Sequence, residues 1–147
     1  MKKALAFAVA GLLAFVAIGA GDKGTQDEAK ALLDKAVAAV KADEGKALAA
    51  FNDPKGGFVD RDLYVFCFDK AGKITAQGAN PAMIGTDVKT IKDPDGKAIG
   101  VEMMSLAAKG GGSVEYKWES PTTKQVGTKV SFVKPAGGQT CGVGAYK

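Results

Sequence analysis

Residues 113–146 read SVEYKWESPTTKQVGTKVSFVKPAGGQTCGVGAY and contain three stretches with strand character. The first, Ser113 to Trp118, alternates so that every second side chain falls on one face. A turn rich in Pro, Thr and Lys separates it from a second strand, Val126 to Val133. A Gly-rich turn at Pro135 to Gly138 precedes the last strand, Thr140 to Tyr146. Connections this short join antiparallel neighbours, so this stretch predicts an antiparallel sheet.

The region before the sheet begins with a helical pattern. Thr25 and Glu28 have the spacing of a capping box, and apolar residues follow with helical period as far as Val40. Gly45 interrupts the period, so we expect either one long helix or a helix with a break near Gly45. The helix should end before Pro54, because proline disfavours helix at the preceding residue.

The middle of the chain predicts a hairpin, a loop and a second helix. Leu63 to Phe68 is rich in aromatic and β-branched residues, and Lys73 to Gln77 forms a second strand after a turn. Gly78 to Lys92 has no clear period, which indicates a loop or short helical turns. Ile99 to Ala107 fits an amphipathic helix, which the glycines from Gly110 onward would end. The predicted fold class is α+β, with a long N-terminal helix and a five-stranded antiparallel sheet under helical cover.

The N-terminus has the pattern of an export signal. Lys2 and Lys3 precede an apolar run from Ala4 to Ala20, and small residues close the run. We therefore predict a signal peptide over residues 1–20 and a single domain over residues 21–147. The alternative is a retained N-terminal membrane anchor, since the run is just long enough to span a bilayer. Either reading predicts a periplasmic or secreted domain.

Composition argues against several classes of function. The formal net charge is +4, and the basic residues are spread along the chain, which argues against nucleic-acid binding. The sequence has no histidine, so the commonest general base and the commonest metal ligand are missing. We predict no catalytic residue, no metal site, no cofactor and no enzymatic activity. A thiol oxidoreductase is the enzymatic alternative, and it would need an exposed, reactive cysteine.

Several short motifs occur in an order that resembles a known family. In chain order they are FNDPKG (51–56), LYVF (63–66), GANP (78–81), IG (84–85), KDPDGK (92–97), YKW (116–118) and CGVGAY (141–146). Together they resemble the single Cache domain of type 2, a PAS-like extracytoplasmic sensor domain, in a stand-alone exported form. One departure is Glu119, which stands where the family often has proline after the tryptophan.

The resemblance implies a function and a place for it. It implies a pocket between one face of the sheet and the segment from Gly78 to Lys109, filled by a small organic ligand such as a carboxylate. The domain would act in signal transduction, for example chemotaxis, through a membrane receptor, a kinase or a transporter. It could also form a homodimer through its N-terminal helix. The alternative is a structural or accessory periplasmic protein with this fold and no ligand.

Three strand residues are the first candidates for ligand contact. Lys129 lies in an otherwise apolar and small-residue strand, and a buried carboxylate needs such a charged donor. The alternative is that Lys129 is a solvated lysine on the outer face of the sheet. Tyr116 and Trp118 share one face and could wall the ligand while offering O–H and N–H donors, and the alternative for both is ordinary core packing.

Two further candidates lie in the segment that would cover the sheet. Asn80 could donate its amide to a ligand or could only shape the turn before Pro81. Met103 suits an adaptable pocket lining, although methionine on the apolar face of a helix is usually packing. The aromatic residues of the first strand, Tyr64, Phe66 and Phe68, are predicted as core rather than site.

Cys67 and Cys141 are the only cysteines, and each lies in a predicted strand. In the strand order of the PAS-like fold, the first and last strands of the sheet are neighbours. An exported chain with two cysteines favours a disulfide between them. The alternative is a pair of buried free thiols.

Overall fold

Two consecutive helices begin the part of the protein that the computed structural model describes, residues 23–147. They are α1 (Gln26–Ala42) and α2 (Glu44–Asn52). The predicted capping box starts α1, since the Thr25 side chain accepts the N–H of Glu28 and the Glu28 carboxylate accepts the N–H of Thr25. The break lies at Asp43, whose side chain accepts the N–H of Lys46 and caps α2. Of the two predictions, the helix with a break near Gly45 is therefore confirmed.

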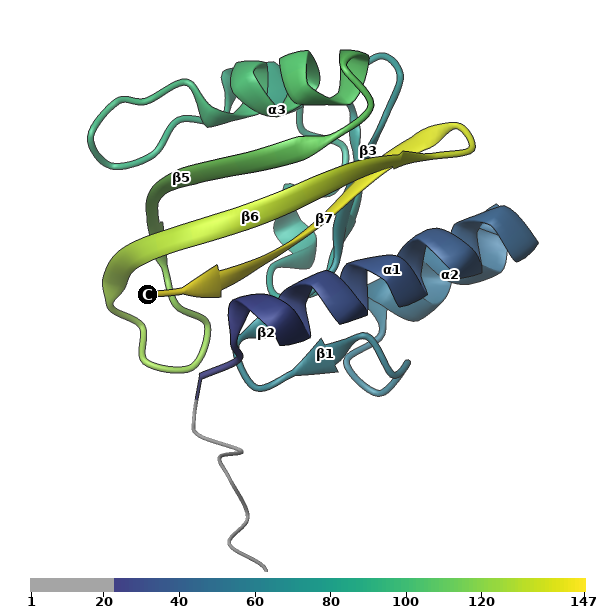
Figure 1. Ribbon diagram of the computed structural model, residues 1–147, viewed down its shortest axis with the longest axis horizontal. Helices are drawn as coiled ribbons and strands as arrows, with labels where there is room; N and C mark the ends of the chain where they lie inside the picture. Colours follow the sequence, from purple (N-terminus) through teal and green to yellow (C-terminus); the bar gives the residue numbers. More distant parts are fainter. Residues whose placement is uncertain (1–22) are drawn as a thin grey trace, which may run out of the picture.

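The sheet has five antiparallel strands in the order β4-β3-β7-β6-β5 (Figure 1). Their bounds are β3 (Phe66–Asp69), β4 (Ile74–Gln77), β5 (Gly112–Glu119), β6 (Val126–Ala136) and β7 (Gln139–Tyr146). The predicted five-stranded antiparallel sheet is confirmed. The last strand, β7, lies between β3 and β6. The first and last strands of this sheet, β3 and β7, are therefore neighbours at its centre.

Two predicted strand boundaries are wrong. The stretch Leu63 to Phe68 is divided at Val65, because β2 (Leu63–Tyr64) pairs with β1 (Val59–Asp60) in a separate two-stranded ribbon. The predicted turn at Pro135 to Gly138 is shorter, because β6 continues to Ala136. The pairing of β6 with β5 extends only as far as Val133, and Pro135 lies beyond it. The missing N–H of Pro135 therefore costs no hydrogen bond to β5.

Helices cover both faces of the sheet. Figure 1 shows α3 (Ile99–Ala108) on one side and α1 with α2 on the other. The predicted loop after β4 contains two single 3-10 turns, η1 (Pro81–Met83) and η2 (Val88–Thr90), and η2 packs against α3. Gly100 permits this close packing, since an added Cβ would overlap with the backbone carbonyl of Val88.

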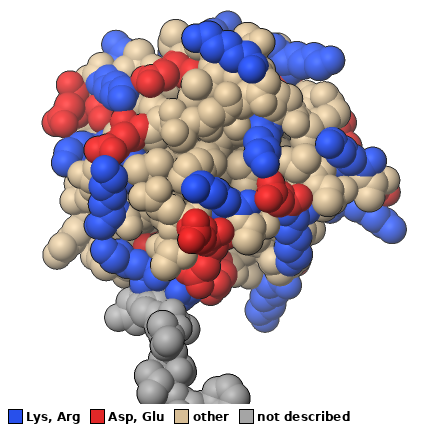
Figure 2. Space-filling view, viewed as in Figure 1, with Lys and Arg blue, Asp and Glu red and all other residues tan. Residues whose placement is uncertain are grey.

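The alternation of the strands divides the core into two layers. The layer under α1 and α2 consists mainly of small and aliphatic side chains, with Phe51, Phe58 and both cysteines. The layer under α3 contains aromatic and sulfur-containing side chains, among them Phe68, Met103 and Tyr116. On the outside, Lys and Arg side chains are interspersed with Asp and Glu over the face seen in Figure 2.

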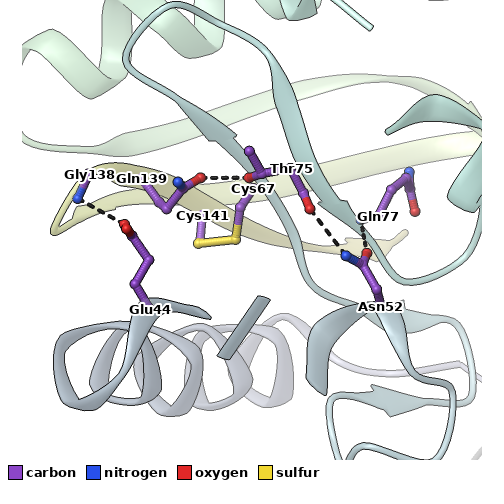
Figure 3. Close-up of a disulfide and its surroundings, with 8 residues drawn as sticks. All are labelled: Glu44, Asn52, Cys67, Thr75, Gln77, Gly138, Gln139 and Cys141. Carbon is purple, nitrogen blue, oxygen red and sulfur yellow. Dashed lines mark hydrogen bonds between the residues drawn. A yellow bond between two sulfur atoms is a disulfide. The ribbon is translucent and has the colours of Figure 1, made fainter. Parts of the chain in front are cut away.

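The disulfide Cys67–Cys141 lies in the layer under α1 and α2 and joins register partners on β3 and β7. Figure 3 shows it on the strands above the helix that carries Glu44, with hydrogen bonds that fix the helices to the sheet. The Asn52 side chain donates to the carbonyl of Thr75 and accepts the N–H of Gln77, at 3.1 and 2.9 Å. The predicted disulfide is confirmed, and both cysteines are fully buried.

The predicted signal peptide or anchor, residues 1–20, lies outside the described residues. Within residues 23–147, no helix combines the length and the apolar character needed to cross a bilayer.

Candidate ligand-binding site

A small cavity lies between α3 and the face of the sheet that it covers. Most of its lining is apolar and comes from β3, β4, α3 and the segment between them: Phe66, Ile74, Met83, Val88, Ile91, Ile99, Gly100 and Met103. Tyr64, Gln77, Tyr116 and Trp118 complete the lining. The cavity has a volume of about 40 Å³. A buried water needs about 10–15 Å³ on this measure, so the cavity has room for roughly three.

A wider hollow of about 500 Å³ adjoins the cavity on the outside. The two spaces share four lining residues, namely Tyr64, Gln77, Met83 and Trp118. Charged side chains, including Lys92 and Glu119, appear only in the lining of the outer hollow. A polar ligand would therefore reach the apolar cavity through this hollow, past Trp118 and Met83.

Lys129 points inward and lies beneath the cavity. It is 1% exposed, and its register partners Tyr116 and Tyr146 place it on the sheet face covered by α3. Its Nζ donates to the hydroxyl of Tyr64 at 2.9 Å and lies 4.2 Å from the centre of the Tyr64 ring. The alternative of a solvated lysine is therefore wrong. Lys129 itself does not line the cavity, but its hydrogen-bond partner Tyr64 does.

The Lys129 ammonium has no opposite charge beside it. Six ion pairs join side chains of residues 23–147, and none of them includes Lys129. Burial works to lower the pKa of Lys129, but Tyr64, Tyr116 and Tyr146 raise it by more as they ionise in alkaline solution. The pKa of Lys129 therefore lies above its ordinary value, and the oxygen and the ring of Tyr64 favour its ammonium form. An unpaired buried charge is costly, so this one is a ready partner for an anion.

Two glycines of β7 make room for the side chains around the cavity. An added Cβ at Gly144 would overlap with Cε of Lys129 and Oγ of Ser131, so the lysine stem lies flat across β7. An added Cβ at Gly142 would overlap with the ring of Phe66. Because β7 presents no side chain here, Phe66 of β3 lines the cavity where it rests on Gly142, and the stem of Lys129 lies over Gly144.

Tyr116 and Trp118 lie beside each other on β5, as predicted. Their rings meet edge to face, with centroids 5.9 Å apart. The Tyr116 hydroxyl shares a buried hydrogen bond of 2.7 Å with Oγ of Ser131. Burial raises the pKa of Tyr116 and likewise that of Tyr146, so both hydroxyls are uncharged at neutral pH. Both Tyr116 and Trp118 line the cavity, and Trp118 also faces the outer hollow.

The other two candidates occupy different places. Met103 lines the inner cavity from α3. Asn80 lines only the outer hollow, and its side-chain oxygen accepts the N–H of Ala82 at 3.2 Å, which caps η1. The structure thus brings Tyr116, Trp118 and Met103 together around one cavity, with Lys129 beneath it and Asn80 outside it.

Tyr64, Phe66 and Gln77 are among the cavity-lining residues that were not predicted as site residues. Tyr64 and Phe66 were predicted as core, and Gln77 was not considered. The Gln77 side chain accepts the N–H groups of Ala79 and Asn80, at 2.9 and 3.2 Å, and so fixes the start of the covering segment. The sequence feature that could have indicated Gln77 is its position at the end of a strand, directly before the GANP motif.

Asp93 has a structural place near the site. One carboxylate oxygen accepts the N–H groups of Asp95 and Lys97, and the other accepts the N–H of Lys117 on β5. Burial raises the pKa of Asp93, but these three donors lower it by more, so the pKa lies below its ordinary value. Asp93 therefore holds the loop before α3 against the edge strand. Within residues 23–147, no group of three or more His, Cys, Asp and Glu side chains could hold a metal ion.

A PAS-like sheet with a small cavity over a buried cation defines a ligand-sensing domain. The chain belongs to the single Cache domain 2 family, whose model matches residues 8–146. Cache domains are non-catalytic sensor modules that lie outside the cytoplasm in chemoreceptors and histidine kinases.

Solved structures share the fold over most of the chain. A methyl-accepting chemotaxis protein of Vibrio parahaemolyticus is 23% identical with a TM-score of 0.70, over 82% of this chain and 86% of that one. A Cache chemosensory domain whose structure describes carboxylic acid recognition is 27% identical with a TM-score of 0.67, over 82% of this chain and 91% of that one.

Two curated relatives are much longer proteins. The sensor histidine kinase MctS of Rhizobium johnstonii is 34% identical over 73 residues, which are 50% of this chain and 16% of the kinase. The methyl-accepting chemotaxis protein McpP of Pseudomonas putida is 35% identical over 76 residues, which are 51% of this chain and 14% of the receptor. The aligned region therefore spans about a sixth of these relatives or less.

Proposed function

We propose that this domain senses a short-chain carboxylate outside the cytoplasm and reports its binding to a partner protein. The observation that carries the proposal is the buried ammonium of Lys129, which has no carboxylate partner among residues 23–147 and contacts a cavity-lining hydroxyl. Carboxylic acid recognition by a structural neighbour of the same fold supports it.

The hydrogen bonds suit a carboxylate on the cavity side of Tyr64. Because the Tyr64 oxygen accepts a hydrogen bond from Lys129, its own O–H is left to donate toward the cavity. A hydroxyl polarised in this way by a cation is a stronger donor than a free one. The Tyr116 hydroxyl also lines the cavity and can donate in parallel when Ser131 is the donor of the hydrogen bond between them. The ligand would thus receive two O–H donors and the charge of Lys129 beneath them.

The volume favours the smallest acids. About 40 Å³ corresponds to roughly three water molecules, which matches an acid of two or three carbons. The alternative function, an accessory protein without a ligand, requires a filled pocket. The space beside Tyr64 and Tyr116 favours the sensor over that alternative.

The proposal includes export and a partner. Residues 1–20 would direct the domain to the periplasm or the medium, or anchor it if they are retained. Because the curated relatives are a kinase and a chemoreceptor, we propose a membrane receptor, a kinase or a transporter as partner. Homodimerisation through α1 is a separate proposal, and sedimentation with and without ligand tests it.

Calorimetric titration and thermal shift with acetate, propionate and longer acids test the proposal. At one hundred times its dissociation constant, a ligand of the native state adds about 2.7 kcal/mol to the free energy of unfolding. We expect Lys129→Met to lose this gain. Lys134→Met is the matched control, because Lys134 lies on the same strand but is exposed and paired with Asp34. An absence of binding across the acids, or equal binding by Lys129→Met, would contradict the proposal.

A further inference from the structure

We infer that Phe66, resting on Gly142, sets the longest acid that the cavity accepts. The inference rests on the proposed function, since it concerns the carboxylate site. Phe66 lines the cavity from β3. An added Cβ at Gly142 would overlap with three atoms of its ring, so the ring lies directly against the backbone of β7. The ring therefore has no space into which it could retreat from a longer ligand.

The opposite wall is held in the same way. Gly100 lines the cavity from α3, and an added Cβ there would overlap with the backbone carbonyl of Val88. The helix thus touches η2 backbone to backbone at this point. One glycine contact thus seats Phe66 on β7, and the other seats α3 on η2.

The position of the carboxylate directs the acid chain toward this end. The hydroxyls of Tyr64 and Tyr116, with Lys129 beneath them, take the polar group. The remaining lining near Phe66 is apolar, from Ile74, Ile99 and Met103. Gln77 pairs with Phe66 in register, but its side chain is engaged by the backbone of Ala79 and Asn80.

Phe66 is the rigid member of this end wall. Methionine side chains such as Met103 have three rotatable bonds and adapt to a ligand. The Phe66 ring has two torsions and is pressed on the backbone, so it does not adapt. A smaller side chain at this position would extend the cavity along β7.

Affinities for straight-chain acids of increasing length test the inference in the wild-type protein and in Phe66→Leu. Each buried methylene raises affinity about fourfold until the cavity is full, after which affinity falls. We expect the best acid for Phe66→Leu to be longer by about one carbon, the size of the space released. The matched control is Phe68→Leu, since Phe68 lies on the same strand and face, is buried, and does not line the cavity.

Gly142→Ala tests the inference in the opposite direction. The added methyl group pushes the Phe66 ring into the cavity, so affinity should fall for every acid and most for the longest. If Phe66→Leu keeps the wild-type optimum while the wild-type protein binds acids, the length limit is overturned alone. If the wild-type protein binds no acid, the proposed function is overturned and the length limit with it.

Discussion

The two faces of the central sheet differ in what they bury, although the same strands build both. On β7, Cys141, Val143 and Ala145 point toward α1 and α2, and Gly142 and Gly144 lie on the side of α3. The first face is filled by aliphatic side chains, the rings of Phe51 and Phe58, and a disulfide. The second face holds a buried lysine, buried hydroxyls and a cavity.

This difference separates stability from binding within one domain. Close packing on the α1 face supplies apolar burial, and the Asn52 side chain at its edge has its hydrogen bonds satisfied by β4. On the α3 face, the glycines of β7 leave space that Lys129 and Phe66 fill only in part. Substitutions on the first face should therefore change stability and leave affinity unaltered, whereas those on the second should change affinity most.

The largest expected effect is removal of the disulfide on the α1 face. Cys67 and Cys141 are 74 residues apart, so the double variant Cys67→Ala, Cys141→Ala should lose about 4 kcal/mol in the chain-entropy model. Denaturant unfolding measures the loss. The affinity of the folded protein for its acid should stay within twofold of wild type, and a large change in affinity would break the separation of the two faces.

The next effect is a cavity on the same face. Leu33 is fully buried between α1 and the sheet, so Leu33→Ala should lose about 3 kcal/mol of unfolding free energy. Leu32→Ala is the control, because Leu32 is only partly buried and should lose less. Equal losses in urea unfolding would show that α1 does not pack as described.

On the α3 face, we expect a substitution that increases the free energy of unfolding of the ligand-free protein. Lys129→Met removes an unpaired buried charge and keeps an apolar stem, so the ligand-free protein should gain about 1 kcal/mol. The same variant should lose the stabilisation by acid. Unfolding in the presence and absence of ligand measures both, and destabilisation of the ligand-free variant would show that the lysine serves the fold.

The smallest effect concerns the loop that covers the site. The pKa of Asp93 is below its ordinary value of 3.8, so the native state gains stability from the ionised group above that pH and loses it as pH falls through the lowered pKa. We expect the melting temperature of the wild-type protein to fall more steeply below pH 4 than that of Asp93→Asn. Asp95→Asn, which keeps the Asp93 carboxylate, should follow the wild type.

Much of the fold was predicted from local patterns. The capping box at Thr25, the turns and the strand alternation each depend on neighbours in sequence, so they indicated the elements in the right order. The division at Val65 was missed because the pairing of Leu63 and Tyr64 with Val59 and Asp60 depends on a separate ribbon, while the residues themselves look like one strand.

The site was predicted less completely. Tyr116, Trp118 and Met103 were found from their faces and their chemistry, and all three line the cavity. Tyr64 and Phe66 were assigned to the core, because a cavity wall and a packed core use the same aromatic residues. The difference between them is the space left beside the ring, which is not a property of the residue type.

Sequence alone determined the element order and the class of fold, because periodicity, turns and family motifs report on these directly. It favoured a disulfide between the two cysteines, and the structure shows the bond. Only the tertiary structure decided that Lys129 faces inward and lies without a counter-charge among residues 23–147. Alternation shows which residues share a face of a strand, but the packing of α3 over that face decides whether they are buried. The role of Gly142 and Gly144 likewise depends on side chains of other strands that lie over them, and such contacts arise only when the sheet is assembled.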